Sequence, residues 1–348
     1  MKRQLEPGLM AGIDVSLREL KVAYQSLRGE TIEIAVENNV NGWRKLAALF
    51  GGKRRCSRVV LEATGTFHMD VAIHLAETAG VEIMVVNPLA ARRFAEAQMR
   101  RAKTDRVDAL VLLAFAQRMA FKPWQPPRAA ILAFRTVARH LGRLVGERVA
   151  VQNQIAAVRA TQTTSTFVID DLVDAVDALG KRIAACEAEA LRITASDPEL
   201  AASHAALDSV PGIADRAAIL ITAEFAVLDR AMTPDQVIAH AGLDPRPYQS
   251  GTIKGARKIS KVGNSRLRAA IHLPSITAAT HDPSVRAAYE KLLERGKLKP
   301  VALTAIGRRL LRVCWVLHKT GGTWNPTLFQ PKGAAVDAPT ATTSRSFP

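Results

Sequence analysis

Apolar and polar residues alternate with a period of two in three short runs near the N-terminus. These runs are residues 9–16, 19–26 and 30–37, with the sequences LMAGIDVS, ELKVAYQS and ETIEIAVE. Such alternation is typical of strands with one buried face, and the short connections LR and LRG suit tight turns. We therefore expect an antiparallel meander of three strands.

Helix-like and strand-like patterns alternate over the following 80 residues. Continuous apolar runs at 57–64 and 81–88 predict buried strands, and helices are expected at 41–50, 67–80, 88–98 and 104–120. Three antiparallel strands followed by β-α-β-α predict a mixed sheet flanked by helices, which is the ribonuclease-H-like order. The fold class expected for the whole chain is α/β plus all-α, with this domain at residues 1–125.

Residues 126–200 carry two stretches with heptad spacing. Apolar residues recur by threes and fours from Val137 to Val158 and from Leu172 to Ile193, and the sequence TQTTSTFVIDD at 161–171 joins the stretches. This spacing predicts a coiled-coil hairpin or a dimerising pair of helices. Two ordinary amphipathic helices on a globular core are the alternative.

A third region, residues 201–322, reads as helical. LDSVPGIADRAAILITAEF at 207–225 predicts two helices joined by a Pro-Gly turn, and further helices are expected at 263–280, 283–296 and 299–319. The backbone N–H groups of a turn such as the one at Gly212 can bind a phosphate, although Pro-Gly turns also simply join helices. The segment 323–348 is rich in Pro, Thr, Ala and Ser and is expected to be disordered.

The chain is strongly basic, and the charge is uneven. It has 48 Lys+Arg against 32 Asp+Glu, a net charge of +16. Residues 250–312 contain 14 of the Lys+Arg and only three acidic residues, so a net +11 lies in this region. Clustering of this kind favours a polyanionic partner, and it suits a surface that binds phosphates.

Other features exclude several classes of protein. No apolar run is long enough to predict a membrane span, and the start MKRQLEPG does not resemble a secretory signal. The three cysteines lie far apart and form no CxxC pair, which argues against a disulfide framework or a zinc site. We expect a cytoplasmic protein with reduced, buried thiols.

Four acidic residues stand where strands and a helix are expected to meet. Asp14 ends the first strand, Glu62 ends a buried strand, and Asp105 and Asp108 would share one face of the helix at 104–120. Four converging carboxylates repel one another unless a cation neutralises them, and Mg²⁺ prefers such hard oxygen ligands. As an alternative, Asp105 and Asp108 favour the N-terminus of a helix and Asp14 occupies a turn.

With these pieces placed, the chain resembles the DEDD-type insertion-sequence transposases of the "IS one-ten" family, which are bridge-RNA-guided recombinases. GIDVS, LEATGTFH, VVNPLAARRFAEAQ and KTDRVDA are similar to the RuvC-like N-terminal domain of that family. SVPGIADRAAILITAEF, IAHAGLDPRPYQSG and RKISKVGNSRLRAAI are similar to its C-terminal transposase domain. A phosphate loop like that of actin-like ATPases is disfavoured, because the second acidic turn and the adenosine loop are not found.

The resemblance implies a catalytic set. Asp14, Glu62, Asp105 and Asp108 match the four metal-binding acids, and Ser250 of YQSG matches the nucleophile that forms a covalent phosphoserine with DNA. Because Ser250 is distant in sequence from the acids, we expect a composite site made by two domains or by partner subunits. Tyr248 is the rival nucleophile. Thr252 and Leu17 depart from residues common in the family, namely glycine and lysine.

The resemblance also implies partners. These are donor and target DNA, a structured guide RNA from the element, and further copies of the chain as a dimer or a tetramer. The nucleic-acid contacts expected besides Gly212 come from basic residues near the serine: Lys254, Arg257, Lys258, Lys261, Arg266 and Arg268. Two other functions stay open from the residues alone, a RuvC-like endonuclease that uses water and a non-catalytic nucleic-acid-binding scaffold.

Overall fold

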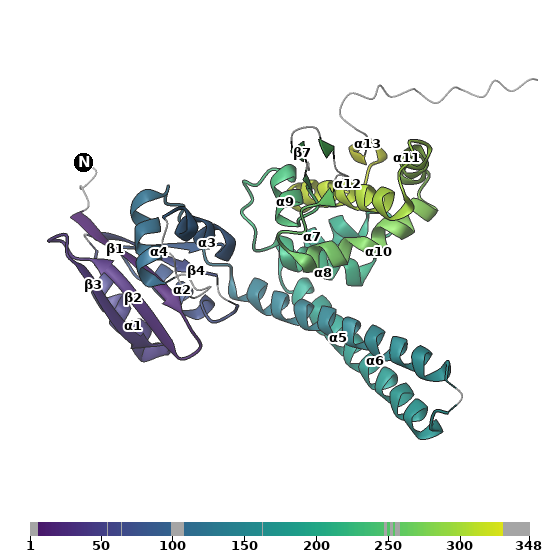
Figure 1. The fold of residues 1–348 in the computed structure, drawn as a ribbon, viewed down its shortest axis with the longest axis horizontal. Helices are drawn as coiled ribbons and strands as arrows, with labels where there is room; N and C mark the ends of the chain where they lie inside the picture. Colours follow the sequence, from purple (N-terminus) through teal and green to yellow (C-terminus); the bar gives the residue numbers. More distant parts are fainter. Residues whose placement is uncertain are drawn as a thin grey trace, which may run out of the picture. The chain divides into compact units, whose positions relative to one another are not determined.

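A computed structural model describes residues 6–53, 55–63, 65–98, 108–161, 163–246, 249–250, 253–254 and 258–329. The chain divides into two compact units, residues 1–126 and 127–348 (Figure 1). The first is a mixed α/β unit and the second is helical apart from four very short strands. Each unit is described on its own.

A five-stranded sheet forms the centre of the first unit. Its strands are β1 (Glu6–Val15), β2 (Glu19–Gln25), β3 (Thr31–Glu37), β4 (Arg55–Glu62) and β5 (Val81–Val86). The order across the sheet is β3-β2-β1-β4-β5, with β1, β2 and β3 antiparallel and β4 and β5 parallel to β1. The predicted meander and mixed sheet are confirmed, and the order is consistent with a RuvC-like fold.

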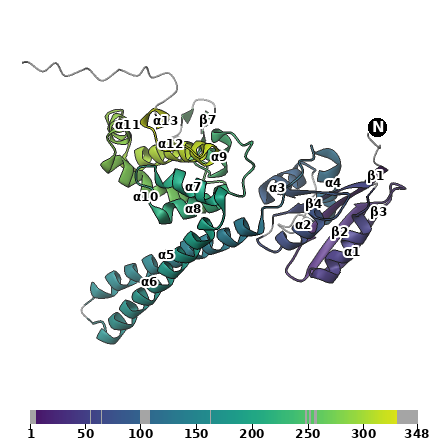
Figure 2. The same cartoon turned by 180° about the vertical axis from the view of Figure 1, so that it is seen from behind.

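Helices cover both faces of this sheet. α1 (Val40–Phe50) and α2 (Met69–Ala76) pack against one face, with Phe50 and Leu75 fully buried among β1 and β4 side chains; Figure 2 shows α1 in front of the sheet. α3 (Pro88–Ala97) and α4 (Ala109–Arg118) pack against the other face. Alternate side chains of the strands therefore enter two separate apolar clusters.

One predicted helix begins later than the pattern indicated. α4 starts at Ala109 rather than at residue 104, and Asp108 is its N-cap with an extended backbone. The expectation that Asp105 and Asp108 share a helix face was therefore wrong, because Asp108 lies before the helix. Apolar periodicity starts at residue 109, so the capping side chain decided the boundary.

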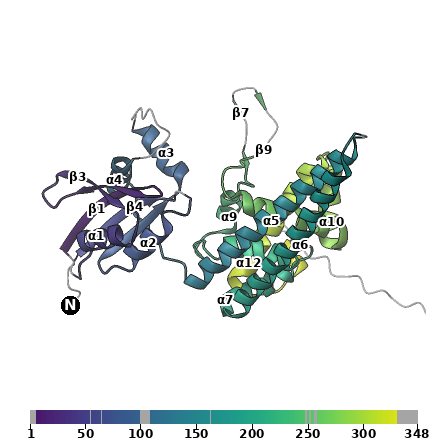
Figure 3. The ribbon, with the colours of Figure 1, turned by 90° about the horizontal axis from the view of Figure 1, so that it is seen from below.

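Two long helices open the second unit. α5 (Ala129–Arg159) and α6 (Thr166–Ala195) lie side by side as an antiparallel pair (Figure 3). Leu141, Leu144 and Ile183 are buried in the half of the pair nearest the other helices, whereas Phe167 at the opposite end is 75% exposed. The connection is shorter than predicted, because residues 166–171 belong to α6.

The remaining helices build a second core around a central helix. They are α7 (Pro198–Asp208), α8 (Asp215–Phe225), α9 (Pro234–His240), α10 (Ser265–His281), α11 (Pro283–Glu294), α12 (Lys299–Thr320) and α13 (Pro326–Phe329). Trp315 of α12 is fully buried and packs edge to face on Phe225. The helices expected at 263–280, 283–296 and 299–319 are confirmed.

The fold continues beyond the start of the expected tail. α13 follows Trp324, whose ring meets that of Phe329, and Phe329 is only 4% exposed. Disorder beginning at residue 323 was therefore a wrong expectation for residues 323–329, because two aromatic side chains attach this segment to the helical core. The rest of the predicted tail lies outside the described residues.

Candidate active site

Asp14 and Glu62 lie at the carboxyl ends of two neighbouring parallel strands. β1 and β4 pair with Ile13 opposite Leu61, and each acid is the next residue of its strand. The register therefore brings the two acids to the same edge of the sheet. The expectation that strands meet at these acids is confirmed for β1 and β4 by their pairing.

Both acids belong to the sheet face that carries α4. Because side chains alternate along a strand, Asp14 shares a face with Gly12 and Glu62 shares a face with Val60. α4 covers both positions: a Cβ on Gly12 would lie 2.4 Å from the Ala109 oxygen, and Val60 is buried in one cluster with α4 side chains. No pattern in the sequence singled out Gly12, yet only glycine lets the helix backbone approach so closely.

α4 runs antiparallel to β1, and its N-terminus lies toward the acids. Its first turns contact Gly12, whereas near its other end Gln117 Nε2 donates to Gln25 Oε1 at 3.3 Å. Gln25 is opposite Met10, nearer the start of β1. The N-terminus of α4 is thus directed to the end of β1 that carries Asp14.

Asp108 is the exposed N-cap residue of α4. Its backbone is extended, with φ of −87° and ψ of 167°, and its Oδ1 accepts the Val111 N–H at 2.8 Å. The helix dipole also favours a negative charge at this position. Asp108 therefore has an ordinary structural role as well as a place near the other two acids.

The three described acids share one end and one face of the sheet, but they do not form a ready ligand cluster. Within the described part of the chain, no three acidic, histidine or cysteine side chains are close enough to hold a metal ion. The fourth predicted acid, Asp105, falls in the stretch 99–107 outside the described residues.

Ser250 lies in one of four short strands that the sequence patterns did not predict. They form two antiparallel ladders: β6 (Pro245–Arg246) with β9 (Lys258–Ile259), and β7 (Gln249–Ser250) with β8 (Ile253–Lys254). Figure 3 labels β7 and β9. Ser250 is opposite Ile253, and two residues separate β7 from β8 in the sequence, which is the spacing of a tight hairpin. The side chain of Ser250 and the residue Tyr248 lie outside the described atoms.

Two glycines fix the base of these ladders. A Cβ on Gly263 (φ 127°) would lie 2.1 Å from the His240 oxygen, and one on Gly242 (φ 66°) would lie 2.7 Å from the Val262 oxygen. Asn264 N–H donates to the same His240 oxygen at 2.7 Å. Two backbones therefore cross closely just before and after the serine-bearing hairpin, and this crossing needs glycine on each segment.

The described basic residues near the hairpin differ in their surroundings. Lys258, Lys261 and Arg266 are exposed. Arg268 is half-buried, and its Nη1 donates to the Ala241 oxygen at 2.8 Å, so at least one donor of this residue holds the glycine crossing together. The side chain of Lys254 and the whole of Arg257 lie outside the described residues.

Gly212 has a packing role that the sequence did not reveal. It adopts φ of 81° in the turn between α7 and α8, and a Cβ there would lie 2.5 Å from the Pro274 oxygen of α10. The two predicted helices on either side of this turn are present, as α7 and α8, but one side of the turn faces another helix. Contact between this turn and a phosphate stays a prediction.

Comparisons with known proteins agree with the two halves of this description. A family model described as a transposase of the DEDD type, named for IS110, matches residues 11–159, and the "Transposase IS116/IS110/IS902 family" model matches residues 204–290. The chain belongs to the IS110 family of transposases. Its family membership implies a DNA substrate and recombinase or transposase activity.

Individual relatives of this transposase are distant. A pilin gene-inverting protein of Moraxella bovis is 24% identical over 262 residues, which cover 74% of this chain and 79% of the relative. An insertion element IS110 protein of Streptomyces coelicolor is 25% identical over 172 residues, 49% of this chain and 41% of the relative. An insertion element IS900 protein of Mycobacterium paratuberculosis is 33% identical over 92 residues, 26% of this chain and 23% of the relative.

Sequence reasoning missed a buried carboxylate in the second unit of the transposase. Glu224 of α8 is 2% exposed and accepts hydrogen bonds from Arg139 Nε at 2.7 Å and Asn264 Nδ2 at 2.8 Å, with Arg135 Nη2 at 3.5 Å. Burial by itself raises the pKa of Glu224, but Arg139, Arg135 and Asn264 outweigh it and lower the pKa to about 2. A sequence signal for this buried carboxylate does exist. It is a lone Glu in the mostly apolar helix α8, together with two Arg residues spaced four apart in α5.

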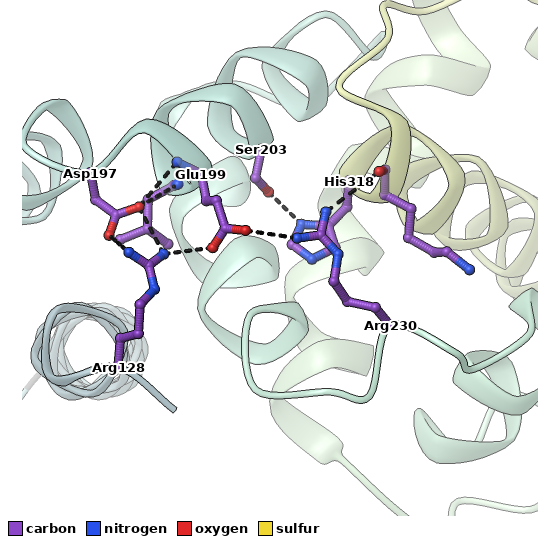
Figure 4. Close-up of polar contacts among 8 residues, drawn as sticks. Arg128, Asp197, Glu199, Ser203, Arg230 and His318 are labelled. Atoms are coloured by element: carbon purple, nitrogen blue, oxygen red, sulfur yellow. Dashed lines mark hydrogen bonds and ion pairs between the residues drawn. The ribbon is translucent and has the colours of Figure 1, made fainter. Parts of the chain in front are cut away.

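A second polar network joins α5, α7 and α12 (Figure 4). Arg128 donates to Asp197 at 2.6 Å and to Glu199 at 2.6 Å, and Glu199 also accepts from Arg230 at 3.0 Å. These contacts tie the start of α5 to the start of α7. Asp197 is 4% exposed and caps α7, so this network is part of the fold.

Ser203 and His318 form a pair that resembles a nucleophile and its base. Ser203 Oγ lies 2.6 Å from His318 Nδ1 (Figure 4). Ser203 is only 2% exposed, and a DNA strand cannot reach it. Burial, with the charge of Arg230 adding to it, lowers the pKa of His318 to about 4, so the pair is a neutral structural contact at pH 7.

The three cysteine thiols differ in how deeply they are buried. Cys314 is buried, and burial raises its pKa to about 12, whereas Cys56 and Cys186 are only half-buried. The expectation of three buried thiols was therefore wrong for two of them.

None of the described helices has the length and apolar character needed to cross a membrane.

Proposed function

We propose that this transposase cuts and rejoins DNA strands through a covalent phosphoserine at Ser250, with Mg²⁺ held by Asp14, Glu62, Asp105 and Asp108. The observation that carries the proposal is the placement of Asp14, Glu62 and Asp108 at one end and on one face of the sheet. Its other support is the pair of family matches that cover the acidic and the serine-bearing regions.

The donor set fits a hard divalent cation. The acids would supply carboxylate oxygens at one end of the sheet, and such hard oxygen donors are the ligands that Mg²⁺ prefers. When bound, the ion would polarise the phosphate and stabilise the charge that develops on its oxygens. Asp108 would bind the ion and cap α4 at the same time. Its Oδ1 accepts the Val111 N–H, so its other carboxylate oxygen would contact the ion.

Ser250 would act as the nucleophile. Its Oγ would form a bond to phosphorus while one bridging P–O bond of the DNA breaks, and the serine proton would end on the strand terminus that is released. Rejoining would reverse the step with a different strand end. Ser250 lies in β7, and only two residues separate β7 from its partner strand β8. This short connection supports a hairpin that presents the serine to DNA.

Recombination is favoured over simple hydrolysis. A relative that spans most of this chain is named a pilin gene-inverting protein, and inversion requires that cut ends be rejoined. A covalent intermediate keeps the energy of the broken bond for that second step, whereas hydrolysis by water would lose it. We therefore prefer a serine transposase to a RuvC-like endonuclease that uses water.

The partners in this proposal are DNA, a structured guide RNA and further copies of the chain. The exposed side chains of Lys258, Lys261 and Arg266 support binding to a polyanion. Because these residues would contact phosphates, the binding affinity should fall as the salt concentration rises. Apolar side chains that stay exposed at the far end of the α5–α6 pair, Val149 (47%) and Phe167 (75%), support self-association through a coiled coil. The guide RNA rests on family resemblance alone.

The covalent step is tested by trapping DNA–protein adducts on denaturing gels. Ser250→Ala should abolish the adduct while duplex DNA binding stays unchanged, because only the nucleophilic oxygen is removed. Tyr248→Phe is the matched control and should retain the adduct. Adducts that persist in Ser250→Ala and vanish in Tyr248→Phe would assign the chemistry to the tyrosine.

A further inference from the structure

A cavity of about 680 Å³ lies between α5, α8 and α10 in the second unit. Its apolar lining combines small residues, among them Ala138 and Gly146 of α5 and Ala270 of α10, with the larger side chains of Val145 and Leu220. Gly142 and Gly146 are one helical turn apart. A Cβ at Gly146 would meet no atom within 4 Å, so the helix backbone itself is exposed to this space.

Positively charged groups surround the apolar part. Arg139, Arg143 and Arg266 line the cavity together with Glu224. Arg143 bonds Glu147 at 2.5 Å on the surface and also contacts His140 Nδ1 at 3.0 Å. Arg266 is exposed at the first turn of α10, on the same cavity.

Buried Glu224 and Glu147, the surface partner of Arg143, are two carboxylates beside four arginines, namely Arg135, Arg139, Arg143 and Arg266, so the surroundings of the cavity stay net positive. Glu224 is shared by Arg139 and Arg135, and Arg266 adds a third positive charge nearby. The pKa of Arg135 is lowered by burial and by the charges of Arg139 and Arg266, and its buried Nε has no hydrogen-bond acceptor among the described residues. The cavity is therefore apolar inside and cationic around its lining, which favours an anionic ligand that also has an apolar part.

We infer that this cavity binds one unpaired nucleotide of the nucleic acid on which the transposase acts. The phosphate would contact Arg143 and Arg266, and the base would lie between the backbone of Gly146 and the side chain of Leu220, which packs over Gly142. Arginine guanidinium planes are common stacking partners of splayed-out bases, and three arginines line this cavity. The inference rests on the proposed function, because it names a subsite for the same polyanion.

An unpaired nucleotide fits this cavity better than a duplex does. Pockets of roughly 300–1,000 Å³ enclose small molecules, and a base reaches such a pocket only after it leaves its stack. The same chemistry can come from single-stranded DNA or from a loop of RNA. The 2′-hydroxyl is the feature that would separate the two sources.

The test fills the cavity at its open wall. Gly146→Leu puts a side chain into the cavity and removes a helix-interior glycine, so the helix gains intrinsic stability. Binding is measured by fluorescence anisotropy with labelled single-stranded DNA, single-stranded RNA and duplex DNA of one sequence. Single-strand affinity should fall about tenfold, in line with the loss of one base contact, while duplex affinity stays unchanged.

Gly180→Leu is the matched control. Gly180 lies in α6, its Cβ would also meet nothing within 4 Å, and it does not line the cavity. This variant should bind all three probes as the unaltered chain does. The arm that loses affinity in Gly146→Leu, DNA or RNA, identifies the source of the nucleotide.

Photo-crosslinking gives a second, independent readout. Probes that carry 4-thiothymidine or 4-thiouridine should attach to α5, α8 or α10 near the cavity, and Gly146→Leu should remove that attachment. Unchanged single-strand affinity in Gly146→Leu, or attachment only elsewhere in the chain, would overturn the inference. Neither result would affect the Ser250 adduct test, so the failure of one proposal can be told from the failure of the other.

Discussion

The two units place their carboxylates in opposite environments. In the second unit Glu224 is 2% exposed and is surrounded by Arg135, Arg139 and Asn264. In the first unit Glu62 ends a strand beside Asp14, and the exposed Asp108 begins a helix over the same sheet face. In the second unit, cationic side chains surround a single acid. In the first unit, several acids lie at one end of the sheet.

This difference teaches how to separate a structural acid from a functional one. A buried carboxylate whose oxygens are bonded to guanidinium groups has little capacity left for a ligand, and its loss leaves positive charges buried. Acids grouped at a strand end gain most when an external cation joins them. We therefore expect the first group to control activity and Glu224 to control stability.

The largest expected effect is on catalysis in the first unit. Glu62→Gln should lower the rate of DNA strand cleavage by at least about 100-fold, because an amide cannot replace a charged oxygen ligand that stabilises the transition state. The melting temperature should change little, since the side chain keeps its shape. Cleavage of a labelled duplex in Mg²⁺ measures the first quantity, and calorimetry measures the second.

Glu82→Gln is the control for Glu62→Gln. Glu82 lies in the neighbouring strand β5 and pairs with Arg58 at 3.1 Å on the surface, so its neutralisation should leave cleavage unchanged. Full activity in Glu62→Gln would remove the metal site from the proposal.

The next effect is on the stability of the second unit. Glu224→Ala should lower the free energy of unfolding by about 3–5 kcal/mol, because it leaves Arg135 and Arg139 buried without their partner. Guanidinium unfolding of the full chain, followed by tryptophan fluorescence, measures the change. Glu189→Ala removes an exposed Glu–Arg pair of α6 and should leave stability unchanged. Equal effects of the two changes would show that burial of Glu224 has no special role.

The smallest effect is a pH dependence that belongs to the second unit. The pKa of His318 falls from 6.5 to about 4 on folding, because burial and Arg230 disfavour its charged form. Between these values the unfolded chain binds a proton that the folded chain does not, so stability is full above pH 6.5 and falls as the pH drops toward 4. The difference corresponds to roughly 3 kcal/mol at most.

His318→Gln should flatten part of this slope. Unfolding curves between pH 4.5 and 6.5 isolate the effect, because Glu224 loses its own contribution only below its ordinary pKa of 4.5. Burial also lowers the pKa of His240, so some slope should remain in the variant. An unchanged slope in His318→Gln would show that His318 does not titrate as its burial requires.

Local patterns were sufficient for most elements of both units. The period-two runs became β1, β2 and β3, and the two apolar runs became β4 and β5. Boundaries that depend on one capping residue or on distant contacts were less predictable. α4 begins directly after its capping residue Asp108, which is later than predicted. The fold continues past residue 323, where Trp324 packs on Phe329.

The candidate site shows the same division. Positions at strand ends and at a helix start pointed to Asp14, Glu62, Asp105 and Asp108, whereas only the family resemblance named Ser250. Four two-residue strands around Ser250 escaped prediction, since such short pieces show no periodicity. Gly12 and Gly212 also gave no local signal, because each is required by a helix that is distant in the sequence.

By itself the sequence determined the meander and mixed sheet of the first unit, the basic character of the second and the family to which the chain belongs. These follow from periodicity, charge and motifs, which are properties of neighbouring residues. Tertiary structure alone decided that Glu224 is buried among arginines and that a cavity lies beside it. The reason is physical: burial, pKa and cavity shape depend on which distant side chains meet, and no local pattern contains that information.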